Sequence, residues 1–143
     1  MNETEALYQS VILERSRQPR FRRRLAGTPH SAKCANPLCG DEVAVELTLD
    51  PGRRIAEVGF SGDGCAILLA SSDLMAEAVT GLDADAARDL GDKFQAMLDG
   101  GSDVSDRALA CFAPLRAYPA RRRCATLAWE ALGQAVNAAG EAI

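Results

Sequence analysis

Five cysteines carry most of the chemistry that this chain could perform, because a cysteine thiolate can bind a soft metal ion or attack another sulfur atom. They are Cys34, Cys39, Cys65, Cys111 and Cys124. The first residues of the chain lack the basic flank and the apolar run of a signal peptide. We therefore expect a cytoplasmic protein, in which cysteines are more often metal-binding or catalytic than disulfide-bonded.

Cys39 and Asp41 lie in a turn-rich segment, residues 36–41. Pro37 and Gly40 predict a tight loop there, which would expose the thiol of Cys39 beside a carboxylate. The alternative is an ordinary surface cysteine next to an aspartate of a turn. This segment alone leaves both interpretations open.

Cys65 and Cys124 are each compatible with a reactive thiol or with a core residue. Cys65 opens an expected helix, whose N-terminal end favours a thiolate, yet it also heads the apolar stripe of that helix. Cys124 follows the basic residues 121–123, which lower a thiol pKa, but it shares a helical face with Leu127 and Ala128. Taken alone, Cys65 is undecided and Cys124 favours the core.

The sequence around Cys34, Cys111 and His30 gives no indication of a reactive or metal-binding side chain. We expect the two cysteines to be small apolar fillers and His30, in a Pro-His-Ser stretch, to be a surface residue. The sequence has no zinc-finger spacing, phosphate loop or nucleotide fingerprint, and its single histidine gives no catalytic triad.

The elements that must position these residues are readable from hydrophobic periodicity. Alternating residues predict strands over 43–49 and 55–60, joined by a turn at 50–52, and a third strand over 31–36. Helical spacing and stop or cap residues predict helices over 4–15, 65–79, 83–98 and 119–139. Strands followed by helices indicate an α+β fold, a small antiparallel sheet of about three strands packed against several helices.

A basic segment, residues 15–24, separates the first helix from the strands and contains Pro19. We interpret it as a solvated connection in preference to a docking surface for an acidic partner.

Length and composition indicate the number of domains and exclude some classes of partner. The 143 residues suit a single domain, 1–143, on the usual scale of about 100–200 residues per domain. The net charge of −4 argues against a nucleic-acid partner, which requires a basic surface. No uncharged apolar stretch approaches the ~18 residues that a membrane span needs.

Three segments together resemble the cysteine motifs of the SufU family, which belongs to the wider group of NifU/IscU-like iron–sulfur assembly proteins. They are NPLCGD at 36–41, GDGCAI at 62–67 and YPARRRCATLAW at 118–129. LYQSVIL at 7–13, with Gln18-Pro19-Arg20 after it, is similar to the opening helix of the family. Glu14-Arg15-Ser16 departs from the Asp-His-Tyr stretch that often ends that helix, which affects expectations about partner docking.

Further features resemble the SufU branch within this group. Scaffolds of the IscU type carry a histidine directly before the third cysteine, where this chain has Arg123, and a Leu-Pro-Pro-Val-Lys stretch that is missing before Cys124. The long connection from Cys65 to Cys124, including the helix that starts at Asp83, resembles the insertion typical of SufU proteins.

The resemblance implies a SufE/NifU-like fold and one zinc site with the ligands Cys39, Asp41, Cys65 and Cys124. Three thiolates and one carboxylate suit tetrahedral Zn²⁺, with Zn–S distances of about 2.3 Å. Such a site is anionic, and the arginines at 121–123 would offset its charge.

The resemblance also implies a role in sulfur transfer. A SufS-type cysteine desulfurase, which carries pyridoxal phosphate, would make a persulfide and pass its sulfur to Cys39, released from the zinc on docking. Other iron–sulfur assembly proteins would be further partners. Two alternatives remain open: a scaffold that builds a [2Fe–2S] cluster on the same ligands, and a structural zinc module whose metal only supports folding.

Overall fold

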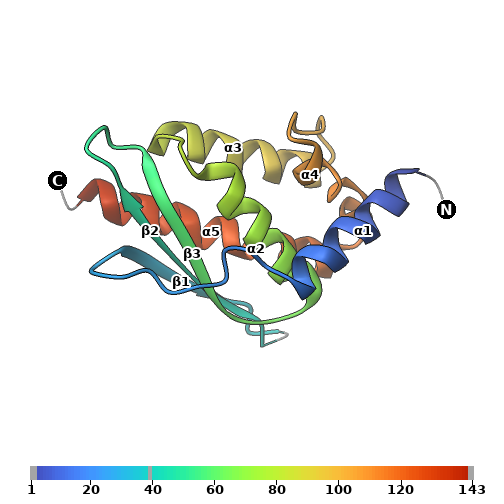
Figure 1. The fold of residues 1–143 in the computed structure, drawn as a ribbon. Helices are drawn as coiled ribbons and strands as arrows, with labels where there is room; N and C mark the ends of the chain where they lie inside the picture. Colours follow the sequence, from blue (N-terminus) through green and yellow to red (C-terminus); the bar gives the residue numbers. More distant parts are fainter. Residues whose placement is uncertain (1–2, 39, 142–143) are drawn as a thin grey trace.

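The alternating segments of the N-terminal half form an antiparallel sheet. The computed structural model describes residues 3–38 and 40–141, and within these ranges the sheet has three strands in the order β1, β2, β3 (Figure 1). The strands are β1 (His30–Ala35), β2 (Glu42–Leu49) and β3 (Ile55–Asp63). The central strand β2 pairs antiparallel with both neighbours. The predicted α+β class with a small antiparallel sheet is confirmed.

The helices follow the predicted segments closely. They are α1 (Glu3–Arg17), α2 (Ala66–Val79), α3 (Ala84–Leu98), α4 (Arg107–Ala110), the 3-10 helix η1 (Ala113–Ala117) and α5 (Pro119–Glu141). Asp83 caps α3 as predicted, since its side chain accepts a hydrogen bond of 2.8 Å from the backbone N–H of Ala86. The short α4 and η1 were not predicted, because elements of one turn show no helical periodicity.

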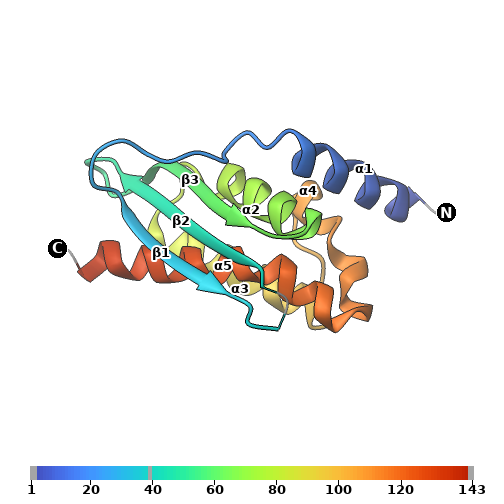
Figure 2. The ribbon, with the colours of Figure 1, turned by 90° about the horizontal axis from the view of Figure 1, so that it is seen from below.

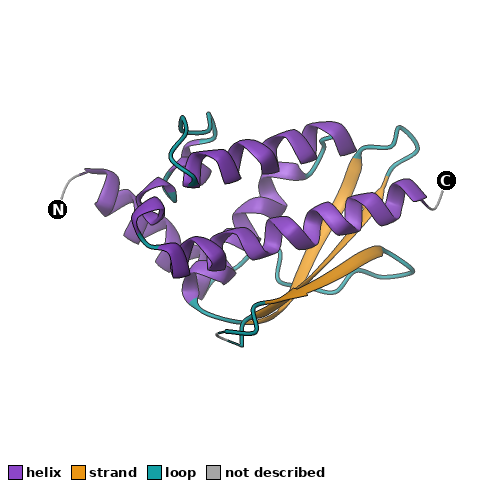
Figure 3. Cartoon of the chain, turned by 180° about the vertical axis from the view of Figure 1, so that it is seen from behind, coloured by secondary structure: helices purple, strands orange, loops and turns teal. Residues whose placement is uncertain are grey.

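The hydrophobic core lies between one face of the sheet and the helices α2 and α5. Val43, Val45 and Leu47 of β2 point into it and are fully buried. The long helix α5 packs on β1 and β2, while α2 packs on β3 and against α5. Figures 2 and 3 show this arrangement from below and from behind, with the helices gathered on one side of the sheet. Within the described residues, no helix is both long and apolar enough to cross a membrane.

The basic segment after α1 exposes Arg17, Arg20, Arg22, Arg23 and Arg24 to solvent, as predicted, but its backbone is bound to the elements of the core. The Phe21 carbonyl accepts a hydrogen bond of 3.0 Å from the Phe60 N–H, which places the segment along the free edge of β3. Arg15 belongs to α1 and is 6% exposed. Both residues lie inward because a buried carboxylate on α2 requires hydrogen-bond donors.

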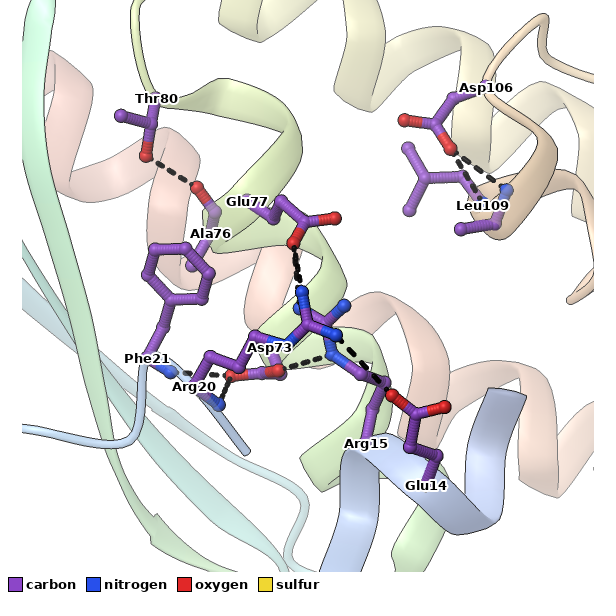
Figure 4. A network of polar contacts seen from close by, with 11 residues as sticks. Glu14, Arg15, Arg20, Phe21, Asp73, Ala76, Glu77, Thr80, Asp106 and Leu109 are labelled. Carbon is purple, nitrogen blue, oxygen red and sulfur yellow. Dashed lines mark hydrogen bonds and ion pairs between the residues drawn. The ribbon is translucent and has the colours of Figure 1, made fainter. Parts of the chain in front are cut away.

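That carboxylate is Asp73, which is 0% exposed and joins α1, the following segment and α2 (Figure 4). Its Oδ2 accepts a hydrogen bond of 2.6 Å from Arg15 Nε. Its Oδ1 accepts bonds of 2.8 and 2.7 Å from the backbone N–H groups of Arg20 and Phe21. Glu77 adds an ion pair to each of the two arginines, at 3.2 and 3.3 Å. Burial alone lowers the pKa of Arg15, but the hydrogen bond and charge of Asp73 outweigh it and raise that pKa.

Asp73→Asn should lower the free energy of unfolding by roughly 3 kcal/mol, because it leaves the buried charge of Arg15 with the half-exposed Glu77 as its one acidic partner among the described residues. Urea denaturation measures this value. Glu14→Gln is the matched control, since the Glu14–Arg20 pair is exposed on both sides and its loss should cost less than about 1 kcal/mol. An equal, small effect of both substitutions would mean that Asp73 does not hold α1 in place.

Candidate metal centre

Three of the four predicted ligands come together although they lie far apart in the sequence. Asp41 directly precedes β2, Cys65 is the N-cap of α2, and Cys124 lies in α5. One ligand atom from each of these residues lies within 4.8 Å of the others. The fourth predicted ligand, Cys39, falls outside the described residues. The cluster thus joins the end of the sheet to both core helices.

The spacing within this cluster fits a tetrahedral metal ion. Cys124 Sγ lies 3.6 Å from Asp41 Oδ2. Zinc distances of about 2.3 Å to sulfur and about 2.0 Å to oxygen place two such ligands roughly 3.5 Å apart in a tetrahedron. Cys124 and Asp41 therefore already stand close to the separation that Zn²⁺ requires, and Cys65 lies within 4.8 Å of both.

Cys65 presents its thiol at the surface. Its backbone is extended, with φ −73° and ψ 170°, and within the described residues its side chain makes no capping hydrogen bond to α2. Cys65 is exposed and so is not the buried end of an apolar stripe, which was one of the two sequence interpretations. Its thiol is available as a ligand at the N-terminal end of α2.

Gly64 allows the carboxylate of Asp41 to approach Cys65. A Cβ atom on Gly64 would lie 3.0 Å from Asp41 Cγ and would overlap the side chain of Leu68. Gly62 has a φ of +134°, and a Cβ atom there would overlap the Glu42 carbonyl oxygen. Gly64 therefore lets the start of β2 lie close to α2, and Gly62 lets β2 and β3 approach each other at this end of the sheet.

A buried hydrogen bond fixes the separation of the two ligating helices. Ser71 Oγ of α2 donates a bond of 2.6 Å to the carbonyl oxygen of Ala125, the residue after Cys124. Both Ser71 and Ala125 are fully buried. The bond ties the helix that begins at Cys65 to the helix turn that carries Cys124.

The loop before β2 is closed on itself by Asn36. The Asn36 N–H donates to the Asp41 carbonyl at 2.8 Å, and the Asn36 carbonyl accepts the Gly40 N–H at 3.0 Å. The Asn36 side chain accepts a bond of 3.1 Å from the N–H of Leu38. Gly40 has a φ of +76°, a conformation that suits glycine. The predicted tight loop is present in its described residues, whereas sequence analysis overlooked the role of Asn36, an asparagine beside a proline in a turn-rich stretch.

Cys124 holds its proton at neutral pH when no metal is bound. Burial, followed by the hydrogen bond and charge of Cys65 and by Asp41, raises the pKa of Cys124 to about 12. A bound cation reverses this preference, because the thiolate is the form that ligates metal. Metal binding at this site would therefore release a proton, and affinity would rise with pH.

The arginines before Cys124 point in different directions. Arg122 Nη1 lies 3.3 Å from the Leu98 carbonyl, at the end of α3, and so faces away from the cluster. Arg121 and Arg123 line a groove that also includes Cys65 and Cys124. The predicted offset of an anionic site is thus available from Arg121 and Arg123.

The remaining cysteines and the histidine lie outside the cluster. Cys111 is buried, its Sγ donates a bond of 2.7 Å to the Ala108 carbonyl, and burial raises its pKa to about 12. Cys34 is half-buried on β1 and accepts a bond of 3.4 Å from Gln134 Nε2. His30 begins β1. Cys111 is thus a buried filler as expected, whereas Cys34 and His30 are only partly buried.

A profile of the family described as "NifU-like N terminal domain" matches residues 7–140, which is nearly the whole chain. The chain belongs to this family. The predicted membership of the SufU and NifU/IscU-like group is confirmed.

Relatives and solved structures extend along almost the full chain. The iron–sulfur cluster assembly scaffold protein IscU of Streptococcus pyogenes serotype M1 is 32% identical over 95% of this chain and 86% of its own. The zinc-dependent sulfurtransferase SufU of Bacillus subtilis is 31% identical over 92% of this chain and 90% of its own.

Two crystal structures share the fold of this chain. A putative scaffold protein for the SUF system from Fervidobacterium islandicum has a TM-score of 0.81 at 28% identity, covering 90% of this chain and 95% of its own. A NifU-like protein from Brucella abortus has a TM-score of 0.85 at 26% identity, covering 97% and 98%.

Gly64→Ala should weaken zinc binding roughly tenfold or more without removing a ligand, because its methyl group would displace the Asp41 carboxylate. Competition with a chromophoric chelator measures the affinity. Gly133→Ala in α5 is the control, since a Cβ atom there meets nothing within 4 Å. If Gly64→Ala bound zinc with wild-type affinity, Asp41 would not be a ligand of the metal.

Proposed function

We propose that this chain is a zinc-dependent sulfur acceptor, which takes persulfide sulfur from a cysteine desulfurase for iron–sulfur cluster assembly. The observation that carries the proposal is the convergence of Asp41, Cys65 and Cys124 beside the loop that contains Cys39. The named role of the SufU relative supports it.

Asp41, Cys65 and Cys124 would hold the zinc, with Cys39 as the fourth ligand. Bound there, zinc supplies a Lewis acid that stabilises thiolates at neutral pH. Two thiols and a carboxylate at near-tetrahedral spacing fit zinc better than the oxygen-only sites of calcium or magnesium. The same donors also bind iron, so a [2Fe–2S] cluster is the second candidate for this site.

The chemistry of transfer is an exchange between two sulfur atoms. The thiolate of Cys39 attacks the terminal sulfur of the persulfide on the desulfurase. A new sulfur–sulfur bond forms at Cys39, the old one breaks, and the desulfurase cysteine leaves as a thiolate. The reaction needs no added oxidant or reductant, because one persulfide replaces another.

Cys39 is a better acceptor than the other ligands because of where the chain holds each residue. Cys65 begins α2 and Cys124 lies within α5, and the bond from Ser71 to Ala125 ties these helices together. Cys39 follows Leu38 in the sequence, in the loop that the hydrogen bonds of Asn36 close. Movement of this loop toward a partner would leave the core packing intact.

The second candidate function is a scaffold on which a [2Fe–2S] cluster is assembled as cargo. The IscU relatives favour it, since one of them is 32% identical to this chain. Arg123 opposes it, because a histidine directly before Cys124 could ligate iron whereas a guanidinium stays protonated and cannot. Arg123 is instead paired with Glu130 of α5.

Protein purified without oxygen should contain about one zinc per chain and should be colourless. Elemental analysis and visible absorbance measure both properties. Stoichiometric iron with the absorbance of a cluster would favour the scaffold over sulfur transfer.

Cys39→Ser should abolish persulfide formation on this chain and its stimulation of a desulfurase, because serine supplies no nucleophilic sulfur. Mass spectrometry after addition of the desulfurase and cysteine locates the persulfide. Cys34→Ser is the matched control, since Cys34 lies outside the cluster and should leave transfer near wild type. Persulfide found mainly on Cys65 or Cys124 would refute the assignment of Cys39.

A further inference from the structure

Leu38 is the most exposed large apolar side chain in the described part of the protein. It is 96% exposed, whereas Leu13 on α1 is 45% exposed and Tyr118 is 55% exposed. One exposed leucine is ordinary on a protein surface, but Leu38 lines one groove together with Ile67, Pro119 and Ala120, and contiguous exposed apolar surface marks protein–protein contacts.

The loop around Leu38 holds it in place. The N–H of Leu38 donates to Asn36 Oδ1 at 3.1 Å, and Asn36 is itself buried and bonded to both Gly40 and Asp41. The loop therefore presents Leu38 outward from a fixed base.

Beside Leu38 runs a groove of about 770 Å³ that reaches the metal ligands. Its apolar wall includes Ile67, Pro119 and Ala120, and its basic residues are Arg121 and Arg123. Its described lining residues include no carboxylate. An occupant that fits the groove combines apolar side chains with acidic ones.

We propose that Leu38 is the apolar anchor by which the desulfurase docks, filling an apolar pocket next to the persulfide-bearing cysteine of that enzyme. The inference rests on the proposed function. It follows from adjacency, because Leu38 precedes Cys39 directly and consecutive Cα atoms are only about 3.8 Å apart. Any protein that delivers sulfur to Cys39 must therefore cover Leu38. Acidic residues at the rim of the enzyme pocket would face Arg121, since Arg123 is already paired with Glu130.

Leu38→Ala should weaken binding of the desulfurase roughly tenfold or more, as expected when a buried leucine anchor is truncated at an interface. Isothermal titration calorimetry with the zinc-loaded protein gives the Kd, and the concentration for half-maximal stimulation of the enzyme should rise in parallel. Zinc content and unfolding should stay at wild-type values, because Leu38 is exposed and is not a ligand.

Two variants serve as controls for this measurement. Leu38→Met keeps an apolar side chain of similar volume and should bind within about threefold of wild type. Leu13→Ala makes the same truncation at another exposed leucine, on α1, and should leave the Kd unchanged.

The possible results test the role of Leu38 independently of the proposed sulfur-acceptor function. Wild-type protein that binds and stimulates the desulfurase, with Leu38→Ala equal to it, overturns the anchor and leaves sulfur transfer standing. Wild-type protein that neither binds nor accepts sulfur overturns both. Unchanged desulfurase binding, together with loss of self-association of Leu38→Ala in analytical ultracentrifugation, would assign the anchor to a second copy of this chain.

Discussion

The contact between α2 and α5 is the constraint on which the candidate metal centre depends. Each helix contributes one cysteine, and neither cysteine has a partner on its own helix. The bond from Ser71 to the Ala125 carbonyl lies in the dry core beneath them, where a hydrogen bond is strong and its loss is costly. The separation of Cys65 from Cys124 is therefore set by core packing and not by the surface residues around the ligands.

Helix α2 connects this centre to the N-terminal part of the chain. Its first turn carries Cys65, and its middle carries Asp73, whose two oxygens hold α1 and the segment after it. A fully buried carboxylate must find donors, and Arg15 with the two backbone amides supplies them. The position of α1 beside the cluster therefore depends on the same helix that presents the ligand. One rigid element thus carries a candidate ligand and holds the N-terminal helix, a favourable arrangement for a preorganised site.

The proposed sulfur-acceptor function draws on two kinds of candidate ligand, some on packed elements of the core and one in a loop. Cys65 and Cys124 lie on packed helices, and Asp41 stands at the start of a core strand. Cys39 and Leu38 belong to the loop outside that strand. A permanent cluster is best served by ligands that are all held, whereas a sulfur acceptor needs one thiol that can reach a partner. The same loop that would accept sulfur also carries the most exposed leucine, which places recognition and reaction side by side.

The sequence by itself determined the secondary structure and the identity of the candidate ligands. Alternation over 43–49 and helical spacing over 65–79 depend on near neighbours, and the cap at Asp83 is a local hydrogen bond, so all three were predictable. The spacing of the cysteine motifs carried the resemblance to a family. Only the tertiary structure decided that Arg15 is buried, because its partner Asp73 lies 58 residues away. It also decided that Cys65 is exposed and that Gly64 must lack a side chain, since both depend on how closely the sheet approaches α2. Such contacts arise from packing between distant segments, which local periodicity does not encode.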